Sequence, residues 1–191
     1  MKVVAFNGSP RKDGNTHTLL RAVLAEVEQE GIETEIVQLG GRNIRGCIAC
    51  LKCFENRNRR CAVDKDILNE CIGKMEAAEG ILLGSPTYFA NMSTEVKALI
   101  DRAGLVAKAN EDMFRRKVGA AVVAVRRAGA VHTMDSINHF FTIGQMIIPG
   151  SSYWNIGVGR EKGQVSGDEE GMRTKQTLGR NMAWLIKKLA A

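Results

Sequence analysis

The sequence predicts a doubly wound α/β fold, in which helices cover both faces of a five-stranded parallel sheet. Short apolar runs of strand length alternate with longer segments whose apolar residues recur every three or four positions. Polar loops that contain glycine follow several of these runs, as expected where parallel strands end at one edge of a sheet. The 191 residues are long enough to bury a large core, so we expect 1–191 to form a single domain.

The first part of the chain supplies two predicted strands with a helix between them. Residues 2–6 (KVVAF) are an apolar run, and leucines and valines over 19–27 then recur at helical spacing. Glu30 and Gly31 end that helix. In residues 33–39 (ETEIVQL), polar and apolar side chains alternate enough to predict a second strand.

The rest of the chain continues the alternation after a cysteine-rich segment. The expected elements are, in order, a helix over 66–76, a buried strand over 80–84, a helix capped by Ser93, a strand over 117–125, a helix over 132–146, a strand near 147–157 that Pro149 interrupts, and a helix from about 168. This alternation predicts the flavodoxin-like strand order 2-1-3-4-5, with the cysteine-rich segment inserted after the second strand.

The loop after the first strand, 7–18 (NGSPRKDGNTHT), has the residues of a phosphate site. Its hydroxyls, amides and backbone N–H groups can surround a phosphate at the N-terminus of a helix. The loop matches neither the G-x-G-x-x-G fingerprint nor a P-loop, so a monophosphate such as that of FMN suits it. A polar turn that only caps the helix is the alternative. The expected direct ligands are Ser9, Asn15, Thr16 and Thr18, with Arg11 or Lys12 adding positive charge.

Two further strand ends are suited to a flat ring. The first contains Pro86, Thr87, Tyr88 and Phe89, which can place apolar and aromatic surface against a ring while backbone groups meet its polar edge. The second, 127–130, includes Arg127 and Gly129 and can approach the ring's other edge. The alternatives are a tight turn with core aromatics and an ordinary surface turn.

The segment 46–61 (GCIACLKCFENRNRRC) holds four of the five cysteines. The spacing C-x2-C-x2-C-x7-C allows four thiolates to face one centre, which is what a [4Fe–4S] cluster needs. Arginines in the last gap favour thiolates. A redox-active thiol segment without a cluster and a zinc site are the alternatives. The four candidate ligands are Cys47, Cys50, Cys53 and Cys61; Cys71 is expected in the core.

Together, G-S-P-R-x-x-G-N-T after the first strand and G-S-P-T-Y-F after the third resemble the NADPH-dependent FMN reductase branch of the flavodoxin-like superfamily. The cysteine motif is similar to that of the iron–sulfur flavoproteins, and the resemblance covers essentially the whole chain. It implies a homodimer or homotetramer with the flavin site near a subunit interface, and an electron carrier such as ferredoxin. It also implies FMN bound at the phosphate by Ser9, Arg11, Asn15 and Thr16, and at the ring by Pro86, Thr87, Tyr88 and Phe89.

These residues predict an FMN-dependent oxidoreductase that passes electrons between a donor, a [4Fe–4S] cluster, FMN and an acceptor. No catalytic acid, base or nucleophile is required of the protein, because the cofactors carry the chemistry. One alternative is an NAD(P)H-dependent FMN or quinone reductase without a cluster. Another is a non-enzymatic FMN-binding redox sensor or electron carrier.

Composition narrows the expected partners and location. The net charge of +6 favours anionic partners, but no nucleic-acid module is recognisable, so nucleic acid is not expected. No apolar run reaches the roughly 18 residues of a membrane helix, and Met1 and Lys2 lead directly into a strand without a signal peptide. We therefore expect a cytoplasmic protein, in which clustered thiols more often bind metal or do redox chemistry than form disulfides.

Overall fold

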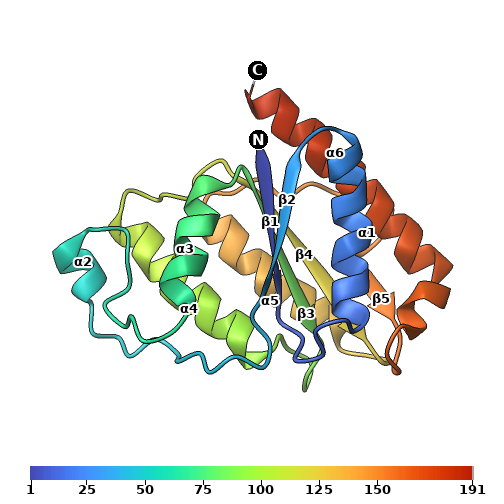
Figure 1. Ribbon diagram of the computed structural model, residues 1–191, viewed down its shortest axis with the longest axis horizontal. Coiled ribbons are helices and arrows are strands. Elements are labelled where there is room, and N and C mark those ends of the chain that lie inside the picture. The colour runs from blue at the N-terminus through green and yellow to red at the C-terminus, as the bar shows by residue number, and fades with distance from the viewer. Residues whose placement is uncertain (191) are drawn as a thin grey trace.

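The computed structural model describes residues 1–190. It has a parallel five-stranded sheet in the order β2-β1-β3-β4-β5, with helices on both faces (Figure 1), so the predicted strand order is confirmed. The strands are β1 (Lys2–Asn7), β2 (Glu33–Gln38), β3 (Gly80–Pro86), β4 (Val118–Val125) and β5 (Ile156–Val158). The helices are α1 (Asn15–Gln29), α2 (Lys52–Asn56), α3 (Leu68–Ala77), α4 (Thr94–Ala109), α5 (Ala130–Ile143) and α6 (Glu169–Ala190), with a 3-10 turn η1 (Gln164–Gly167) before α6.

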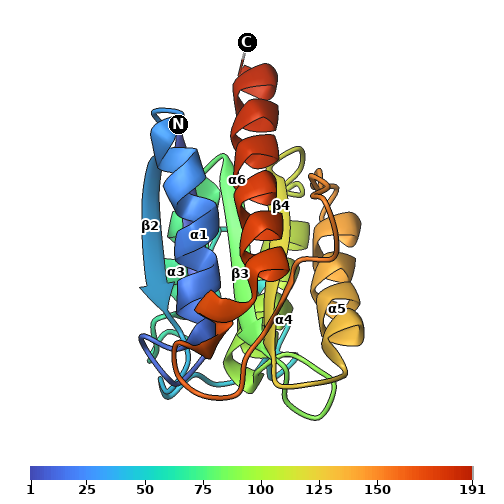
Figure 2. The ribbon, with the colours of Figure 1, turned by 90° about the vertical axis from the view of Figure 1, so that its right-hand side faces the viewer.

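Two apolar layers sandwich the sheet. Helices α1 and α6 cover one face, and α3, α4 and α5 cover the other (Figure 2). Alternate residues of β1 belong to opposite layers: Val3 and Ala5 pack in the first, whereas Val4 and Phe6 pack in the second. Every residue of β4 is buried, as expected of a central parallel strand that is covered on both faces.

The structure differs from the sequence prediction mainly around the last strand. Ile147 makes only an isolated bridge to Val118, and β5 begins at Ile156 and has three residues. Pro149 has no N–H to donate to a ladder, so continuous pairing over 147–157 does not form. The short helix α2 within the cysteine-rich segment was not predicted.

The carboxyl ends of β1, β3 and β4 lie together at the lower edge of the sheet in Figure 1. The cysteine-rich segment is inserted after β2, as predicted, and α2 lies at the end of the molecule beside α4 (Figure 1). None of the helices within residues 1–190 is both long and apolar enough to span a membrane.

Candidate functional site

A cavity of about 310 Å³ opens at the carboxyl ends of β1, β3 and β4. The first two predicted loops meet there, because parallel strands bring their carboxyl ends to one edge of the sheet. We call it the strand-end cavity. Its lining residues are Ser9, Arg11, Asn15, Thr16, Pro86, Thr87, Tyr88, Ala124, Val125, Arg126, Gly159 and Arg160.

The first wall of the strand-end cavity is shaped by Asn7, the last residue of β1. Its buried side chain donates to the Lys12 carbonyl (3.2 Å) and to Gln38 Oε1 (2.8 Å), and its Oδ1 accepts from the Ser9 N–H (3.1 Å). The Ser9 hydroxyl oxygen in turn accepts from the Arg11 N–H at 3.2 Å. The loop therefore has a fixed shape before any ligand enters.

The N-terminus of α1 presents free donors to this cavity. The first backbone N–H groups of a helix have no intrahelical partners. The residue before this helix is Gly14, which has no side chain that could cap these groups. Thr16, the second residue of the helix, is buried and lines the cavity. Free N–H groups, a hydroxyl and the helix dipole together favour an anion such as a phosphate.

Asn15 lines the cavity, but its side chain binds protein rather than pointing freely into the space. Its Nδ2 donates to the carbonyls of Gly159 and Glu161, both at 3.0 Å, and its Oδ1 accepts from the Val165 N–H at 3.4 Å. Both amide hydrogens are therefore used. Asn15 ties the start of α1 to the segment that follows β5, which forms another wall of the cavity.

The turn after β3 forms the opposite wall. The Thr87 N–H donates to the Ala124 carbonyl (2.8 Å), and Tyr88 and Asn91 exchange two backbone hydrogen bonds. The Thr87 hydroxyl is buried and has no partner among the described residues. Buried polar atoms without partners are rare in folded proteins, so this hydroxyl fits a polar ligand edge in the strand-end cavity.

Four of the candidate FMN residues do not line the strand-end cavity. Phe89 is fully exposed at the tip of its turn, and the Thr18 hydroxyl donates to the Gly14 carbonyl at 3.4 Å. Arg127 and Gly129 line a neighbouring cavity, also of about 310 Å³, together with Tyr153 and Trp154.

The sequence analysis missed five lining residues, Ala124, Val125, Arg126, Gly159 and Arg160. Ala124 and Val125 are the last two residues of β4, and Arg126 directly follows them, but its neighbour Arg127 was chosen instead. Gly159 and Arg160 follow β5, whose end was predicted to within one residue, so the strand end itself was a signal for them.

The four clustered cysteines line a second cavity, of about 20 Å³, with Arg102, Leu105 and Val106 of α4. We call it the thiol cavity. Ala49 and Leu51, which lie between the first three cysteines, have left-handed φ angles of 52° and 56°. Such φ angles are uncommon outside glycine, and alternation of this kind forms concave backbone sites for anions, including Fe–S clusters.

Among the four clustered cysteines, Cys61 has hydrogen bonds to side chains from outside the cysteine-rich segment. Asn69, which is buried, accepts from the Cys61 N–H (2.8 Å) and donates to the Cys61 carbonyl (2.9 Å). Arg102 Nε donates to Cys61 Sγ at 3.3 Å. The backbone and the sulfur of this cysteine are thus both fixed by side chains from outside the cysteine-rich segment.

Arg102 is fully buried and forms an ion pair with Asp66. Burial by itself lowers the pKa of Arg102, but hydrogen bonds to Asp66 and Cys61 outweigh it and raise that pKa. Burial likewise acts to raise the pKa of Asp66, but the hydrogen bonds from Arg102 and from backbone N–H groups lower it. Both groups are therefore charged.

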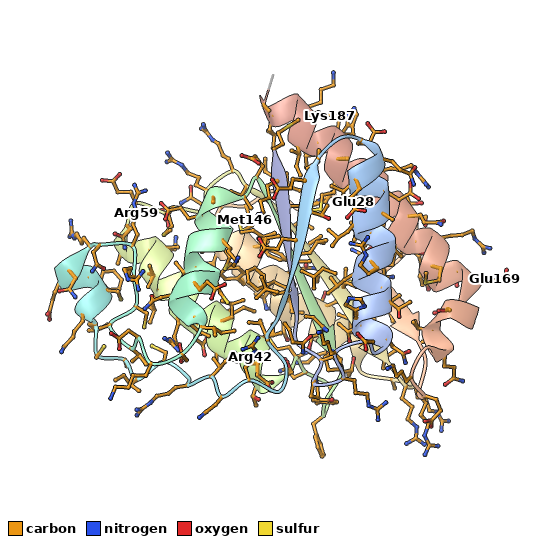
Figure 3. The ribbon with its side chains drawn as sticks, in the orientation of Figure 1. Glu28, Arg42, Arg59, Met146, Glu169 and Lys187 are labelled. Atoms are coloured by element: carbon orange, nitrogen blue, oxygen red, sulfur yellow. The ribbon has the colours of Figure 1, made fainter. Side chains whose placement is uncertain are left out.

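The arginines of the last cysteine gap do not contact the thiols. Arg59 forms an ion pair with Glu76 and lies at the α2 end of the molecule (Figure 3). Arg57 Nε donates to the Phe54 carbonyl at 3.2 Å. The guanidinium beside the thiols is that of Arg102, which the sequence analysis missed. A signal was present, since Arg102 follows Leu99 by three residues and thus occupies the apolar face of its helix.

The comparisons with known proteins show the family of the chain. Residues 1–161 match the family model of the NADPH-dependent FMN reductases. The chain belongs to this family. It is therefore an FMN-dependent oxidoreductase.

Curated relatives are named iron–sulfur flavoproteins. One from Methanocaldococcus jannaschii is 38% identical, and the match covers 98% of each chain. Another from Methanosarcina thermophila is 34% identical over 80% of this chain and 78% of the relative. The chain thus resembles these relatives over most or all of its length, the cysteine-rich segment included in the longer match.

Solved structures with low identity share the fold. RosB, solved with an 8-demethyl-8-formylriboflavin-5′-phosphate intermediate, is 16% identical with a TM-score of 0.73, covering 100% of this chain and 80% of RosB. A WrbA-like flavodoxin from Agrobacterium tumefaciens is 14% identical with a TM-score of 0.67, covering 98% of this chain and 97% of that protein.

Proposed function

We propose that this protein is an electron-transfer iron–sulfur flavoprotein that binds FMN in the strand-end cavity and a [4Fe–4S] cluster in the thiol cavity. When bound, FMN supplies one- and two-electron chemistry and the cluster supplies one-electron chemistry. The observation that carries the proposal is that the two cavities contain complementary binding groups: free N–H and hydroxyl donors in one, four thiols in the other.

The strand-end cavity suits FMN in both its polar and its flat parts. The start of α1, with the hydroxyls of Ser9 and Thr16, provides donors for a phosphate. Across the cavity, Pro86 and Tyr88 provide apolar surface for a ring, and Thr87 provides a polar atom that lacks a partner. Arg11, Arg126 and Arg160 give this cavity a positive charge that favours a phosphorylated ligand.

A cluster in the thiol cavity is supported by the cysteines and by the relatives. Cys47, Cys50, Cys53 and Cys61 line this one cavity, and four thiolates are what a [4Fe–4S] cluster needs. Curated relatives that match most or all of the chain are named iron–sulfur flavoproteins. Among residues 1–190, no group of three or more His, Cys, Asp or Glu side chains is arranged to hold a metal ion, so the proposal rests on the motif and the relatives.

The two cavities share no lining residue, and α4 lines only the thiol cavity. Ser93, just before this helix, lies against Gly8 of the first loop, and Arg102 lies at the thiols. Nine residues of helix correspond to roughly 13 Å. We further propose that the protein is a homodimer or homotetramer, and that an acidic carrier such as ferredoxin exchanges electrons with the cluster.

A second candidate is an NAD(P)H-dependent FMN or quinone reductase without a cluster. The observation in its favour is the neighbouring cavity lined by Arg127, Tyr153 and Trp154, which adjoins the strand-end cavity at Val125. A basic side chain and two exposed aromatic rings are suited to a nicotinamide nucleotide. Rapid FMN reduction by NADPH in protein that contains no iron would favour this candidate.

The deciding experiment is anaerobic purification and reconstitution, followed by quantification of iron, sulfide, zinc and flavin. We expect about four irons and four sulfides per FMN. The matched variants are Cys61→Ala, which should lower the iron content, and Cys71→Ala, which should not, because Cys71 is buried in the core and burial raises its thiol pKa to about 12. Flavin without iron or sulfide after reconstitution would contradict the proposal.

A further inference from the structure

We propose that Arg102 is a positioning residue for the fourth cluster ligand. Its guanidinium holds the Cys61 sulfur toward the other three thiols, and its hydrogen bond to that sulfur raises the reduction potential of the bound cluster. The inference rests on the proposed function, because it names a residue that acts on the cluster. Arg102 lies on α4, outside the cysteine-rich segment, and is 41 residues away from Cys61 in the sequence.

Arg102 closes the cysteine-rich segment by holding both of its ends. Its Nη1 donates to the Arg45 carbonyl at 3.0 Å, two residues before the first cysteine. Its remaining donors reach Cys61 Sγ, the Val63 carbonyl and the Asp66 carboxylate, all at or after the last cysteine. A planar guanidinium with five N–H donors can join groups in this way.

The resulting position of Cys61 does not depend on a cluster. Asn69 fixes its backbone through two hydrogen bonds, and Arg102 fixes its sulfur. By contrast, Cys47 and Cys50 are exposed. The position of Cys61 is therefore set by residues of α3 and α4, and not by the seven-residue gap that precedes it in the chain.

The hydrogen bond also has an expected electronic effect. A cluster with four thiolate ligands is anionic, and reduction makes it more negative. An N–H donated to a ligating sulfur stabilises the reduced form, so the potential rises. If Arg102 were only the ion-pair partner of Asp66, loss of its Nε–H would change the stability of the fold but not the reduction potential of the cluster.

The test compares Arg102→Lys with Arg60→Lys in reconstituted protein. Lysine at 102 keeps the positive charge but has neither the Nε–H nor the forked geometry. Arg60 is the exposed neighbour of Cys61, and its side chain makes no hydrogen bond or ion pair within the described chain. We expect a more negative midpoint potential and about tenfold faster loss of iron to a chelator for Arg102→Lys, with Arg60→Lys matching the wild type. An unchanged potential in folded Arg102→Lys protein would overturn the inference.

A second measurement needs no variant at position 102 and covers the case in which Arg102→Lys does not fold. Wild-type and Arg60→Lys proteins are labelled with ¹⁵N-arginine, and the reduced cluster is examined by pulsed electron paramagnetic resonance. Coupling to an arginine ¹⁵N in both proteins is the expected result. No coupling in either protein, or coupling that disappears with Arg60, would show that Arg102 does not donate to the cluster.

Measurements on the protein without a cluster distinguish a failure of this inference from a failure of the proposed function. If wild-type protein binds no iron, the cluster proposal fails, and with it the effect on potential. The positioning role is then decided by alkylating the thiols at about pH 9.5, above their usual pKa, so that the rates report access. We expect the Cys61-to-Cys47 labelling ratio to rise in Arg102→Lys and to stay the same in Arg60→Lys. An unchanged ratio in Arg102→Lys would refute the positioning role.

Discussion

At the scale of single residues, the strand-end cavity contains a polar atom that the protein leaves without a partner. The Thr87 hydroxyl is buried in the wall that faces the start of α1, and within residues 1–190 nothing accepts from it or donates to it. An unsatisfied buried hydroxyl costs the folded protein about 1–3 kcal/mol. In the proposed FMN complex the ligand would supply the missing hydrogen bond, and binding would recover this cost.

Thr87→Val should therefore have opposite effects on the two forms. It removes the unsatisfied hydroxyl and keeps the side-chain shape, so the melting temperature of apo-protein should stay equal or rise. FMN should bind more weakly by about 1 kcal/mol, or roughly fivefold, through loss of one hydrogen bond. Calorimetry of FMN binding and thermal unfolding of apo-protein measure the two effects. Thr94→Val, at the exposed first residue of α4, is the control and should leave FMN affinity unchanged.

At the scale of elements, the short strand β5 depends on the start of α6. Lys175 Nζ donates to the Ile156 carbonyl (2.9 Å), and the Val158 N–H donates to Asp168 Oδ2 (2.7 Å). Asp168 Oδ1 also accepts from the Gly171 N–H at 3.0 Å, which caps the helix. Two side chains thus hold a strand of three residues and, through it, the segment at Gly159 that lines the strand-end cavity.

Asp168→Ala should lower both stability and FMN affinity. The variant loses the helix cap, which contributes about 1 kcal/mol, and leaves the Val158 N–H without its partner. Because β5 leads into a wall of the cavity, we expect weaker FMN binding as well as a lower melting temperature. Glu169→Ala is the control, since Glu169 is exposed on α6 (Figure 3) and its ion pair with Arg173 is 3.5 Å long. Equal FMN affinity in the two variants would contradict this role for β5.

Lys175 makes stability depend on pH in the alkaline range. Its side chain is fully buried, and burial lowers its pKa to about 8, with Asp168 partly opposing the shift. An unfolded chain keeps this proton up to about pH 10.4. Between these values the unfolded state binds more protons than the folded state, so the contribution of Lys175 to the unfolding free energy rises with pH.

Comparison with Lys175→Met isolates this contribution. The difference between the unfolding free energies of wild type and variant should grow in favour of the wild type from pH 8 to about 10.4, by an amount on the order of 3 kcal/mol. Below pH 8 the difference should be flat, because Lys175 is protonated in both states. Urea unfolding at several pH values measures it, and a difference that stays constant across the alkaline range would show that Lys175 does not titrate as burial requires.

At the scale of the whole molecule, structural features that follow from local periodicity could be predicted from the sequence. Features that depend on contacts between residues far apart in the chain could not. The order of the sheet follows from alternating strands and helices, and the two ligand loops follow from strand ends, so both could be predicted. The start of β5 could not, because Asp168 and Lys175, which hold this strand, come later in the chain. The burial of Arg102 follows from its place on the apolar face of its helix, but its contact with Cys61 could not be predicted, since it spans 41 residues.

The charge of the molecule supports a last prediction, about the proposed electron carrier. The surface around the thiol cavity combines the exposed basic residues Lys52, Arg57 and Arg60 with the exposed apolar residues Ile48 and Leu51. The chain has a net charge of +6, and the basic residues of this surface attract an acidic protein over several ångströms. The apolar residues can then contact the docked protein. Electron transfer from a reduced acidic ferredoxin should therefore slow as salt is added, because the attraction is screened.

Charge reversal at Arg57 and Arg60 should lower the rate of electron transfer from this ferredoxin by roughly tenfold at low salt and remove most of its salt dependence. The matched control is Lys187→Glu with Lys188→Glu, which changes the net charge equally near the C-terminal end of α6, away from α2 (Figure 3). Stopped-flow absorbance of the protein, mixed with the reduced carrier at several salt concentrations, measures the rate. Equal slowing by the two double variants would mean that only net charge matters and that the carrier does not dock at the thiol cavity. A selective loss at Arg57 and Arg60 would place the entry of electrons at the four cysteines, which line the thiol cavity together with α4.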